Sequence, residues 1–279
     1  MRRVLIGLAA AAVAASMVPK APAAPMHRVG ITPFAAGAAN EVSTNWAGYA
    51  VSAPAKGKRF TSVTGRWVQP VAACDGAQTY SAFWVGLGGY SRRSYAVEQT
   101  GTQANCDFGQ PDYVAWYELF PAPPVNLGMS VRAGDLMSAT VSVDRRTVRV
   151  RLKNVTRNRV FTKLLRMKRP DLSSAEWITE APTGCDYLGN CTTLPLTNFG
   201  TVDFSHGIAA MTGHRGRISD TRWKATAIEL HGDLQDPVHP TLAGANALPG
   251  ALGGDGGSFR ISWQTLTPPP PPPPPPPAG

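Results

Sequence analysis

The sequence predicts an all-β protein, either an antiparallel sandwich or a barrel. Short segments rich in aromatic and β-branched residues follow one another from about residue 44 to residue 264, and turns of Gly, Pro, Asp and Asn separate them. No window shows an apolar period of 3.6 residues over a helical length. Gly (28) and Pro (26) together make up 54 of the 279 residues, which suits a protein of strands and turns.

The strands can be placed in order along the chain. We expect them at residues 45–51, 62–69, 80–87, 112–119, 136–143, 147–152, 160–165, 176–180, 223–230 and 258–264. The stretch 232–257 is rich in Gly, Pro and Ala, and we expect a long mobile loop there before the last strand.

The two ends of the chain differ from this strand-rich body in composition. Arg2 and Arg3 precede an apolar run that ends near Val18, and Ala21-Pro22-Ala23 is a small-x-small cleavage pattern. Residues 1–23 are therefore expected to be a signal peptide, which predicts a secreted, extracellular protein with no membrane contact after cleavage. Residues 24–40 are expected to be a linker or short propeptide, 41–266 the β-sandwich domain, and 267–279 a polyproline II tail containing ten consecutive prolines.

Composition and motifs exclude several classes of protein. No apolar run of membrane-spanning length lies inside the body, which excludes a multi-pass membrane protein. There is no Gly-x-Ser-x-Gly, no Cys-x-x-Cys and no His-Glu-x-x-His, so a serine triad and a metal site have little support. In an exported chain, an even number of cysteines points to disulfides rather than to a thiol nucleophile. The four are Cys74, Cys106, Cys185 and Cys191.

One segment is strongly basic. From Arg145 to Arg169 there are eleven Lys or Arg and no Asp or Glu. Arg149, Arg151 and Lys153 alternate with apolar residues, so a strand would carry the charges on one face. This is either the solvated face of a sheet or a surface for an acidic polymer or cell wall. Nucleic acid is disfavoured because no aromatic residues interleave with the charges.

Aromatic and polar residues gather in five segments, which we take to be extended. These are Asn45-Trp46-Ala47-Gly48, Phe83 to Gly89, Glu98-Gln99-Thr100-Gly101, Ala115 to Pro121, and Ala175 to Glu180. On an extended strand Trp116 and Glu118 share a face, as do Glu176 and Glu180, whereas Glu98 and Gln99 must point to opposite faces. A sheet lined in this way could hold a polymer such as a peptide or a sugar chain.

Taken together and in this order, the five segments resemble the glutamic peptidases, the eqolisin family. The resemblance covers roughly 220 residues. It implies two curved antiparallel sheets of the concanavalin A-like lectin and glucanase type. It also implies a metal-independent endopeptidase without cofactors, which acts on protein or peptide substrates as a monomer at acidic pH. Carried over by motif position, the catalytic dyad is Gln99 and Glu180, and Trp84, Trp116 and Glu118 are expected to face the substrate.

The family also suggests a disulfide after the last motif, which corresponds to Cys185 and Cys191. The other two cysteines, Cys74 and Cys106, match no bridge of the family and could pair with each other. Two family acids are absent, since Gly88 and Val114 stand in their places. Because clustered carboxylates raise one another's pKa, the working pH could differ from the strongly acidic range of the family.

Two other functions remain open at this stage. A glycosidase on the same architecture would use two carboxylates, either Glu176 with Glu180 or Glu118 with Glu180. Gln99 would then be a bystander. A non-catalytic lectin-like module would instead use Trp84 and Trp116 as stacking platforms for a polysaccharide.

Overall fold

The computed structural model describes residues 31–33, 40–53, 58–91, 94–185, 191–232 and 245–265. Strands make up all the regular secondary structure within these ranges, and no helix long and apolar enough to span a membrane occurs among them. The expected signal peptide and the proline tail lie outside the described residues, so export, the cleavage site and the domain limits stay predictions.

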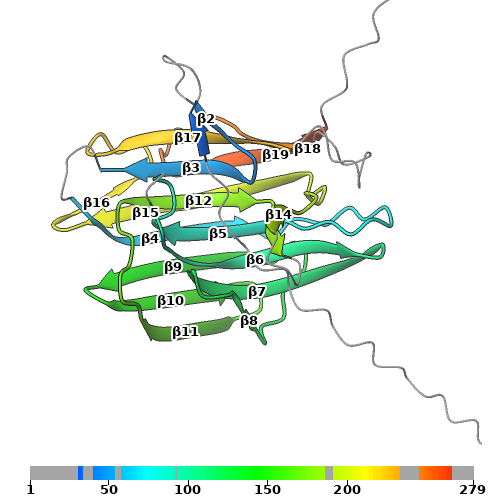
Figure 1. Cartoon of the computed structure of the whole chain (residues 1–279), viewed down its shortest axis with the longest axis horizontal. Coiled ribbons are helices and arrows are strands. Elements are labelled where there is room, and N and C mark those ends of the chain that lie inside the picture. The colour runs from blue at the N-terminus through cyan, green and yellow to red at the C-terminus, as the bar shows by residue number, and fades with distance from the viewer. Residues whose placement is uncertain are drawn as a thin grey trace, which may run out of the picture.

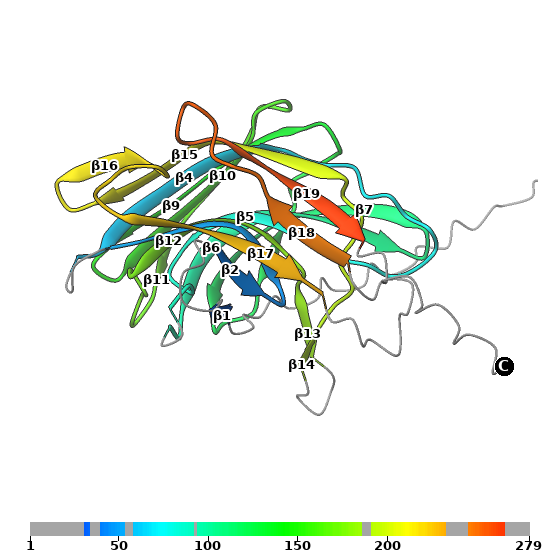
Figure 2. The ribbon, with the colours of Figure 1, turned by 90° about the horizontal axis from the view of Figure 1, so that it is seen from above.

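All the described strands except β13 and β14 form one sheet, which folds back on itself into two layers (Figure 1, Figure 2). The first layer runs, by hydrogen-bonded neighbours, through β8 (Val125–Leu127), β7 (Gln110–Phe120), β6 (Val97–Asp107), β5 (Ala82–Leu87), β12 (Ser174–Glu180), β3 (Trp46–Ser52) and β17 (Lys224–His231). The second runs through β11 (Arg159–Arg166), β10 (Thr147–Asn154), β9 (Leu136–Asp144), β4 (Phe60–Val68), β15 (Thr201–Met211) and β19 (Phe259–Thr265).

The two layers are joined along one edge and separate at the other. β18 (Ala245–Pro249) pairs with β17 and with β19, and so links the layers. At the opposite edge β8 ends one layer and β11 ends the other. β16 (His214–Arg217) extends β15, and the short hairpin of β13 (Thr183–Cys185) and β14 (Cys191–Thr193) forms its own sheet. The predicted antiparallel all-β sandwich is confirmed.

Two strands near the N-terminal end complete the first layer. β2 (Asn40–Ser43) lies parallel to β17, the one parallel ladder among the described strands, and β1 (Ile31–Pro33) pairs with β2. The sheet therefore takes up part of the segment that was expected to be a linker or short propeptide.

Alternating side chains divide the molecule into a central core and two outward faces. On β10, Val148, Val150 and Leu152 are fully buried in the core between the layers, whereas the intervening cations point outward. The predicted alternation of this basic strand is confirmed. Large aromatic side chains, including Trp67, Trp177, Phe60, Phe83 and Phe204, fill the core. Burial of such side chains is the main stabilising contribution in a sandwich of this kind.

Two expectations about the C-terminal third are wrong. β18 lies inside the stretch that was expected to be a loop, and β15 was not predicted at all. In β15 the pairing with β4 shifts register between Ser205 and Ile208, and His206 has a left-handed φ of 54°. This β-bulge breaks the alternation of apolar residues by which a strand is recognised from sequence.

Candidate active site

A second apolar cluster lies on the face of the first layer that is turned away from the core. It includes Trp46, Trp84, Trp116, Ile178 and Ile228. We call this surface, with the polar residues among these side chains, the site face. Cross-strand partners share a face of the sheet, so the register places Gln99 of β6 here between Gly86 of β5 and Glu118 of β7. Glu180 of β12 belongs to the same face, between Ala82 and Trp46.

Glycines make room for the large rings of this surface. Gly101 stands in register between Trp84 and Trp116. A Cβ at Gly101 would lie 2.6 Å from the Cβ of Trp84 and 2.2 Å from the carbonyl oxygen of Phe83. A Cβ at Gly86 would lie 2.9 Å from the ring of Trp84 and 3.2 Å from the Cβ of Gln99. The glycines of the Trp-Val-Gly and Gln-Thr-Gly segments thus allow the Trp84 indole to lie directly beside Gln99.

Glu180 is held by two donors. The indole Nε1 of Trp84 donates to Oε2 at 2.8 Å, and the amide of Asn45 donates to Oε1 at 3.3 Å. Burial raises the pKa of Glu180 to about 8, and the hydrogen bond from Trp84, the neighbouring indole of Trp46 and the Asn45 amide lower it only in part. The carboxyl of Glu180 is therefore fixed in orientation and binds a proton more readily than an exposed glutamate does.

Gln99 and Glu118 form a second pair on the same surface. The Nε2 of Gln99 donates to Oε2 of Glu118 at 2.6 Å, and the Oε1 of Gln99 is buried without a hydrogen-bond partner in the protein. Burial, together with the nearby charge of Glu180, raises the pKa of Glu118 to about 9. Near neutral pH, Glu118 is accordingly protonated, and Gln99 keeps one N–H and one carbonyl oxygen available.

Burial without counter-ions is the common feature of these three groups. Glu180 is 2% exposed, Gln99 4% and Glu118 1%. Among the described residues, neither glutamate forms an ion pair with Lys, Arg or His. The structure therefore joins Trp84 with Glu180, and Gln99 with Glu118, on one surface. Trp116 is also there, but its buried Nε1 makes no hydrogen bond within the protein.

Two further buried glutamates, Glu98 and Glu176, do not belong to these two hydrogen-bonded pairs. Glu98 lies on the opposite side of β6 from Gln99, as predicted, and accepts a hydrogen bond from the backbone N–H of Asp171 at 3.2 Å. Glu176 shares the site face but is in register with Gly86 and Ala50, and both of its carboxyl oxygens lack a normal hydrogen bond. Burial raises the pKa of both carboxyls well above the ordinary value.

The structure gives a reason for one of the missing family acids. Gly88 has a left-handed φ of 77°, and a Cβ there would lie 2.5 Å from the carbonyl oxygen of Asp171. An aspartate therefore does not fit at this position unless the backbone moves. Val114, at the place of the other family acid, is buried on the site face.

Asn45, Trp46 and Tyr90 are contributors to the site that the sequence did not single out as functional residues. Asn45 and Trp46 surround Glu180, and the ring of Trp46 packs edge-on against Trp84 at 5.0 Å. The sequence feature that could have indicated both residues is the Asn-Trp segment, the first of the five segments. Tyr90 packs against the site-face cluster.

The structure describes one of the two expected disulfides. Cys74 and Cys106 form a disulfide, so the suggested pairing of these two residues is confirmed. The bridge ties the end of β6 to the segment between β4 and β5. The backbone register places Cys185 opposite Cys191 in the β13–β14 hairpin, but their side chains lie outside what the structure describes, and the bridge between them stays a prediction.

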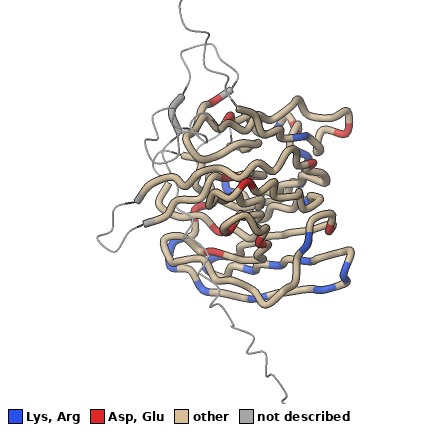
Figure 3. Tube along the Cα trace, turned by 90° about the vertical axis from the view of Figure 1, so that its right-hand side faces the viewer, with Lys and Arg blue, Asp and Glu red and all other residues tan. Residues whose placement is uncertain are grey.

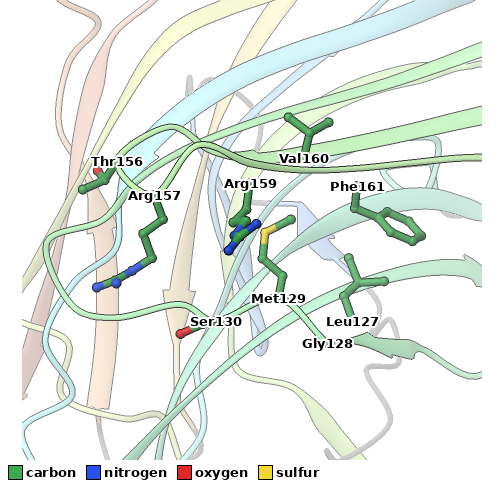
Figure 4. Close-up of a pocket in the computed structure, with 9 residues that line it drawn as sticks. All are labelled: Leu127, Gly128, Met129, Ser130, Thr156, Arg157, Arg159, Val160 and Phe161. Carbon is green, nitrogen blue, oxygen red and sulfur yellow. The ribbon is translucent and has the colours of Figure 1, made fainter.

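A groove of the protein lies away from the site face. It has a volume of about 960 Å³ and lies at the open edge of the sandwich, between the end of β8 and the start of β11 (Figure 4). Leu127, Met129, Val160 and Phe161 line it together with Arg157 and Arg159. None of the predicted catalytic residues is among the residues that line this groove. The described residues contain no group of His, Cys, Asp or Glu suited to hold a metal ion.

Comparison with known proteins identifies the family. The model of the peptidase A4 family matches residues 44–238, which is more than half of the chain and includes all five segments of the site. The chain belongs to the peptidase A4 family. A curated relative, aspergillopepsin-2 of Aspergillus niger, is 26% identical over 217 residues, covering 69% of this chain and 72% of the relative. The resemblance inferred from the five segments is thereby confirmed, and the chain is a glutamic-type peptidase.

Solved structures of related proteins have the same fold. Scytalido-glutamic peptidase, solved with a peptide-based transition-state analogue, superposes with a TM-score of 0.64 at 21% identity, covering 80% of this chain and 99% of that one. SCP-B, an eqolisin solved with the tripeptide Ala-Ile-His, has a TM-score of 0.61 at 20% identity and the same coverage. Aspergilloglutamic peptidase from Aspergillus niger has a TM-score of 0.54 at 23% identity, covering 67% of this chain and 99% of that one. These likenesses confirm the sandwich fold.

Proposed function

We propose that this peptidase is a secreted endopeptidase in which Glu180 and Gln99 act together on the scissile peptide bond. The observation that carries the proposal is that one face of the sheet holds both a fixed, buried carboxyl and an amide whose oxygen has no hydrogen-bond partner in the protein. Peptide hydrolysis needs a base for water, a donor for the oxyanion and an acid for the leaving nitrogen. These two side chains offer all three.

The steps follow from the available atoms. Glu180, as a carboxylate, takes a proton from the attacking water, while the Oε1 of Gln99 accepts the water's other hydrogen and helps place it. The N–H of Gln99 that is not bound to Glu118 donates to the oxyanion of the tetrahedral intermediate. Protonated Glu180 then passes its proton to the leaving amine, and the carboxylate is restored. An oxyanion donor of this kind is worth roughly 3–4 kcal/mol of transition-state stabilisation.

Glu118 has a positioning role in this scheme. Protonated, it accepts from Gln99 without adding a negative charge beside the oxyanion, and it holds the amide in one orientation. Trp84 likewise holds the carboxyl of Glu180 in one orientation, by donating a hydrogen bond to it. The rings of Trp84 and Trp116 form the apolar part of the surface against which an extended substrate would lie.

The acidic working range expected from the family is the part that this site supports least. A general base acts as its carboxylate, and raising its pKa from 4.5 to about 8 makes that form scarce in acid. We therefore place the acid limb of the activity profile between these two values, at a higher pH than an ordinary carboxyl would give.

The proposal is tested by hydrolysis of a denatured protein between about pH 2 and 10, in the presence of a chelator, a serine-protease inhibitor and pepstatin. We expect cleavage that resists all three inhibitors and is lost in Gln99→Ala. Cleavage that any of the inhibitors abolishes would point to another mechanism. Full activity in a folded Gln99→Ala variant would remove Gln99 from the reaction.

A further inference from the structure

A pocket at one end of the sandwich gathers cations from three separate segments. It has a volume of about 500 Å³ and is distinct from the site face. The turn between β9 and β10, the segment that crosses from β11 to β12, and the residues just before β4 bring six exposed cations to its walls, namely Lys58, Arg59, Arg145, Arg146, Lys168 and Arg169. Only the 145–169 segment was evident from the sequence; the fold adds Lys58 and Arg59.

These charges are not neutralised by the protein. Among the described residues, none of the six cations forms an ion pair with Asp or Glu. The one carboxylate in the lining, Asp171, instead accepts hydrogen bonds from Ser94 and from the backbone N–H of Ser173. Asp144 is the nearest acid along the β9–β10 turn and is exposed. Six like charges at one place repel one another, and an anion bound there would relieve this repulsion.

The cationic surface continues beyond the pocket along β10. Arg149, Arg151 and Lys153 follow one another on the outward face of this strand, and alternate residues of a strand are about 6.7 Å apart. Their cross-strand partners on β9 are Ser142, Thr140 and Ser138, which carry hydroxyls and no charge. Figure 3 shows the Lys and Arg positions gathered on the strands of this side of the molecule.

We propose that the pocket and the adjoining row on β10 form a docking site for a linear polyanion with one phosphate or carboxylate group in each repeat. A regular row of cations fits a regular row of anions, and guanidinium groups match both phosphate and carboxylate geometry. A single small anion would call for converging, buried donors, whereas all six cations of the pocket are exposed. Single-stranded nucleic acid fits less well, because Tyr95 is the one aromatic side chain that lines the pocket.

The test is a binding titration of the full chain with labelled linear polyphosphate and, separately, with polygalacturonate, each at about 50 and about 200 mM salt. The pocket variant is Arg146→Gln combined with Arg169→Gln, and a second variant, Lys58→Gln with Arg59→Gln, removes two charges from another segment. The matched control is Arg215→Gln with Lys224→Gln. It removes two exposed cations from β16 and β17, which do not line the pocket.

We expect at least one polymer to bind, and its affinity to fall steeply with salt. Either pocket variant should weaken this binding by about tenfold or more, because each removes two of the cations that would contact the polymer. The control should change binding less than about twofold. Which polymer binds more tightly identifies the anionic group. Absence of binding by both polymers, or equal losses in the pocket and control variants, would overturn the proposal.

Discussion

The two outward faces of this sandwich carry acidic groups on one and basic groups on the other, in opposite surroundings. The site face holds Glu118, Glu176 and Glu180, all of them buried and none ion-paired among the described residues. The outward face of β10 carries the exposed Arg149 and the half-buried Arg151 and Lys153, and β9 beside it offers hydroxyls. Both faces arise from the same two-residue alternation of a strand. What differs is the access of water, which sets the pKa on one face and leaves charges free for a partner on the other.

The comparison shows that burial, more than neighbouring charge, controls the chemistry of the site. For both Glu118 and Glu180 the largest cause of the raised pKa is removal from water. The two absent family acids are therefore not needed to keep these carboxyls protonated near neutral pH. Changes at the site face should affect activity and its pH dependence, whereas changes on the outward face of β10 should affect binding to polyanions alone.

Apart from removal of the base Glu180, the largest expected effect on activity comes from replacing the side-chain amide of Gln99. Gln99→Ala should lower kcat by about 10² to 10³, the loss that follows removal of one oxyanion donor. Gln99→Glu should be at least as damaging, because it replaces the donor with an acid beside Glu118. The measurement is steady-state hydrolysis of a peptide, with folding checked by circular dichroism. A loss confined to KM would mean that Gln99 binds substrate only.

Removing the disulfide should affect stability rather than chemistry. Replacing both Cys74 and Cys106 with Ala opens a loop whose ends are 32 residues apart, and loss of such a bridge costs about 2–5 kcal/mol. Chemical denaturation of the variant against wild type measures the change. Because the bridge is outside the site face, kcat of the folded variant should stay near the wild-type value, and a large loss of kcat would contradict this division.

The buried glutamates make stability depend on pH in a definite direction. A carboxyl with a raised pKa in the folded state favours folding while it is protonated, so its contribution is complete below about 4.5 and is lost as the pH rises through about 8 to 9. Tm should therefore fall over this range. Glu176→Gln should make the fall shallower, because an uncharged amide replaces a carboxyl whose oxygens have no normal hydrogen bond. An unchanged slope would show that water reaches Glu176.

The smallest expected effect is a change in the shape of the activity profile. Deprotonation of Glu118 near pH 9 places a negative charge beside the oxyanion donor, so kcat/KM should fall at alkaline pH. Glu118→Gln should remove this alkaline limb and leave the acid limb in place. Loss of the acid limb instead would mean that Glu118, and not Glu180, is the base.

The sequence predicted those parts of the molecule that local alternation determines. The outward row on β10 and the opposite orientations of Glu98 and Gln99 needed only the two-residue period of a strand. β15 was missed because a bulge interrupts that period, and β18 because Ala, Asn and Pro are poor strand formers. Pairings between distant strands, such as the one that brings Asn45 to Glu180, depend on tertiary register.

The same limit applies to charge. The basic segment was visible along the chain, but the pocket was not, because Lys58 and Arg59 reach it only through the fold. The raised pKa values were likewise not predictable, since they depend on how completely the side chains are removed from water. The pH range of the activity therefore depends on burial that the sequence alone does not show.

The most direct test of the central claim compares two glutamates on one strand. Glu180→Gln and Glu176→Gln each remove a buried carboxyl from the site face of β12, and only Glu180 is held by Trp84 and Asn45. Hydrolysis of a denatured protein should fall by about 10² to 10⁴ in Glu180→Gln and stay within about threefold of wild type in Glu176→Gln. Retained activity in a folded Glu180→Gln variant, or equal losses in both variants, would contradict the assignment of Glu180 as the base.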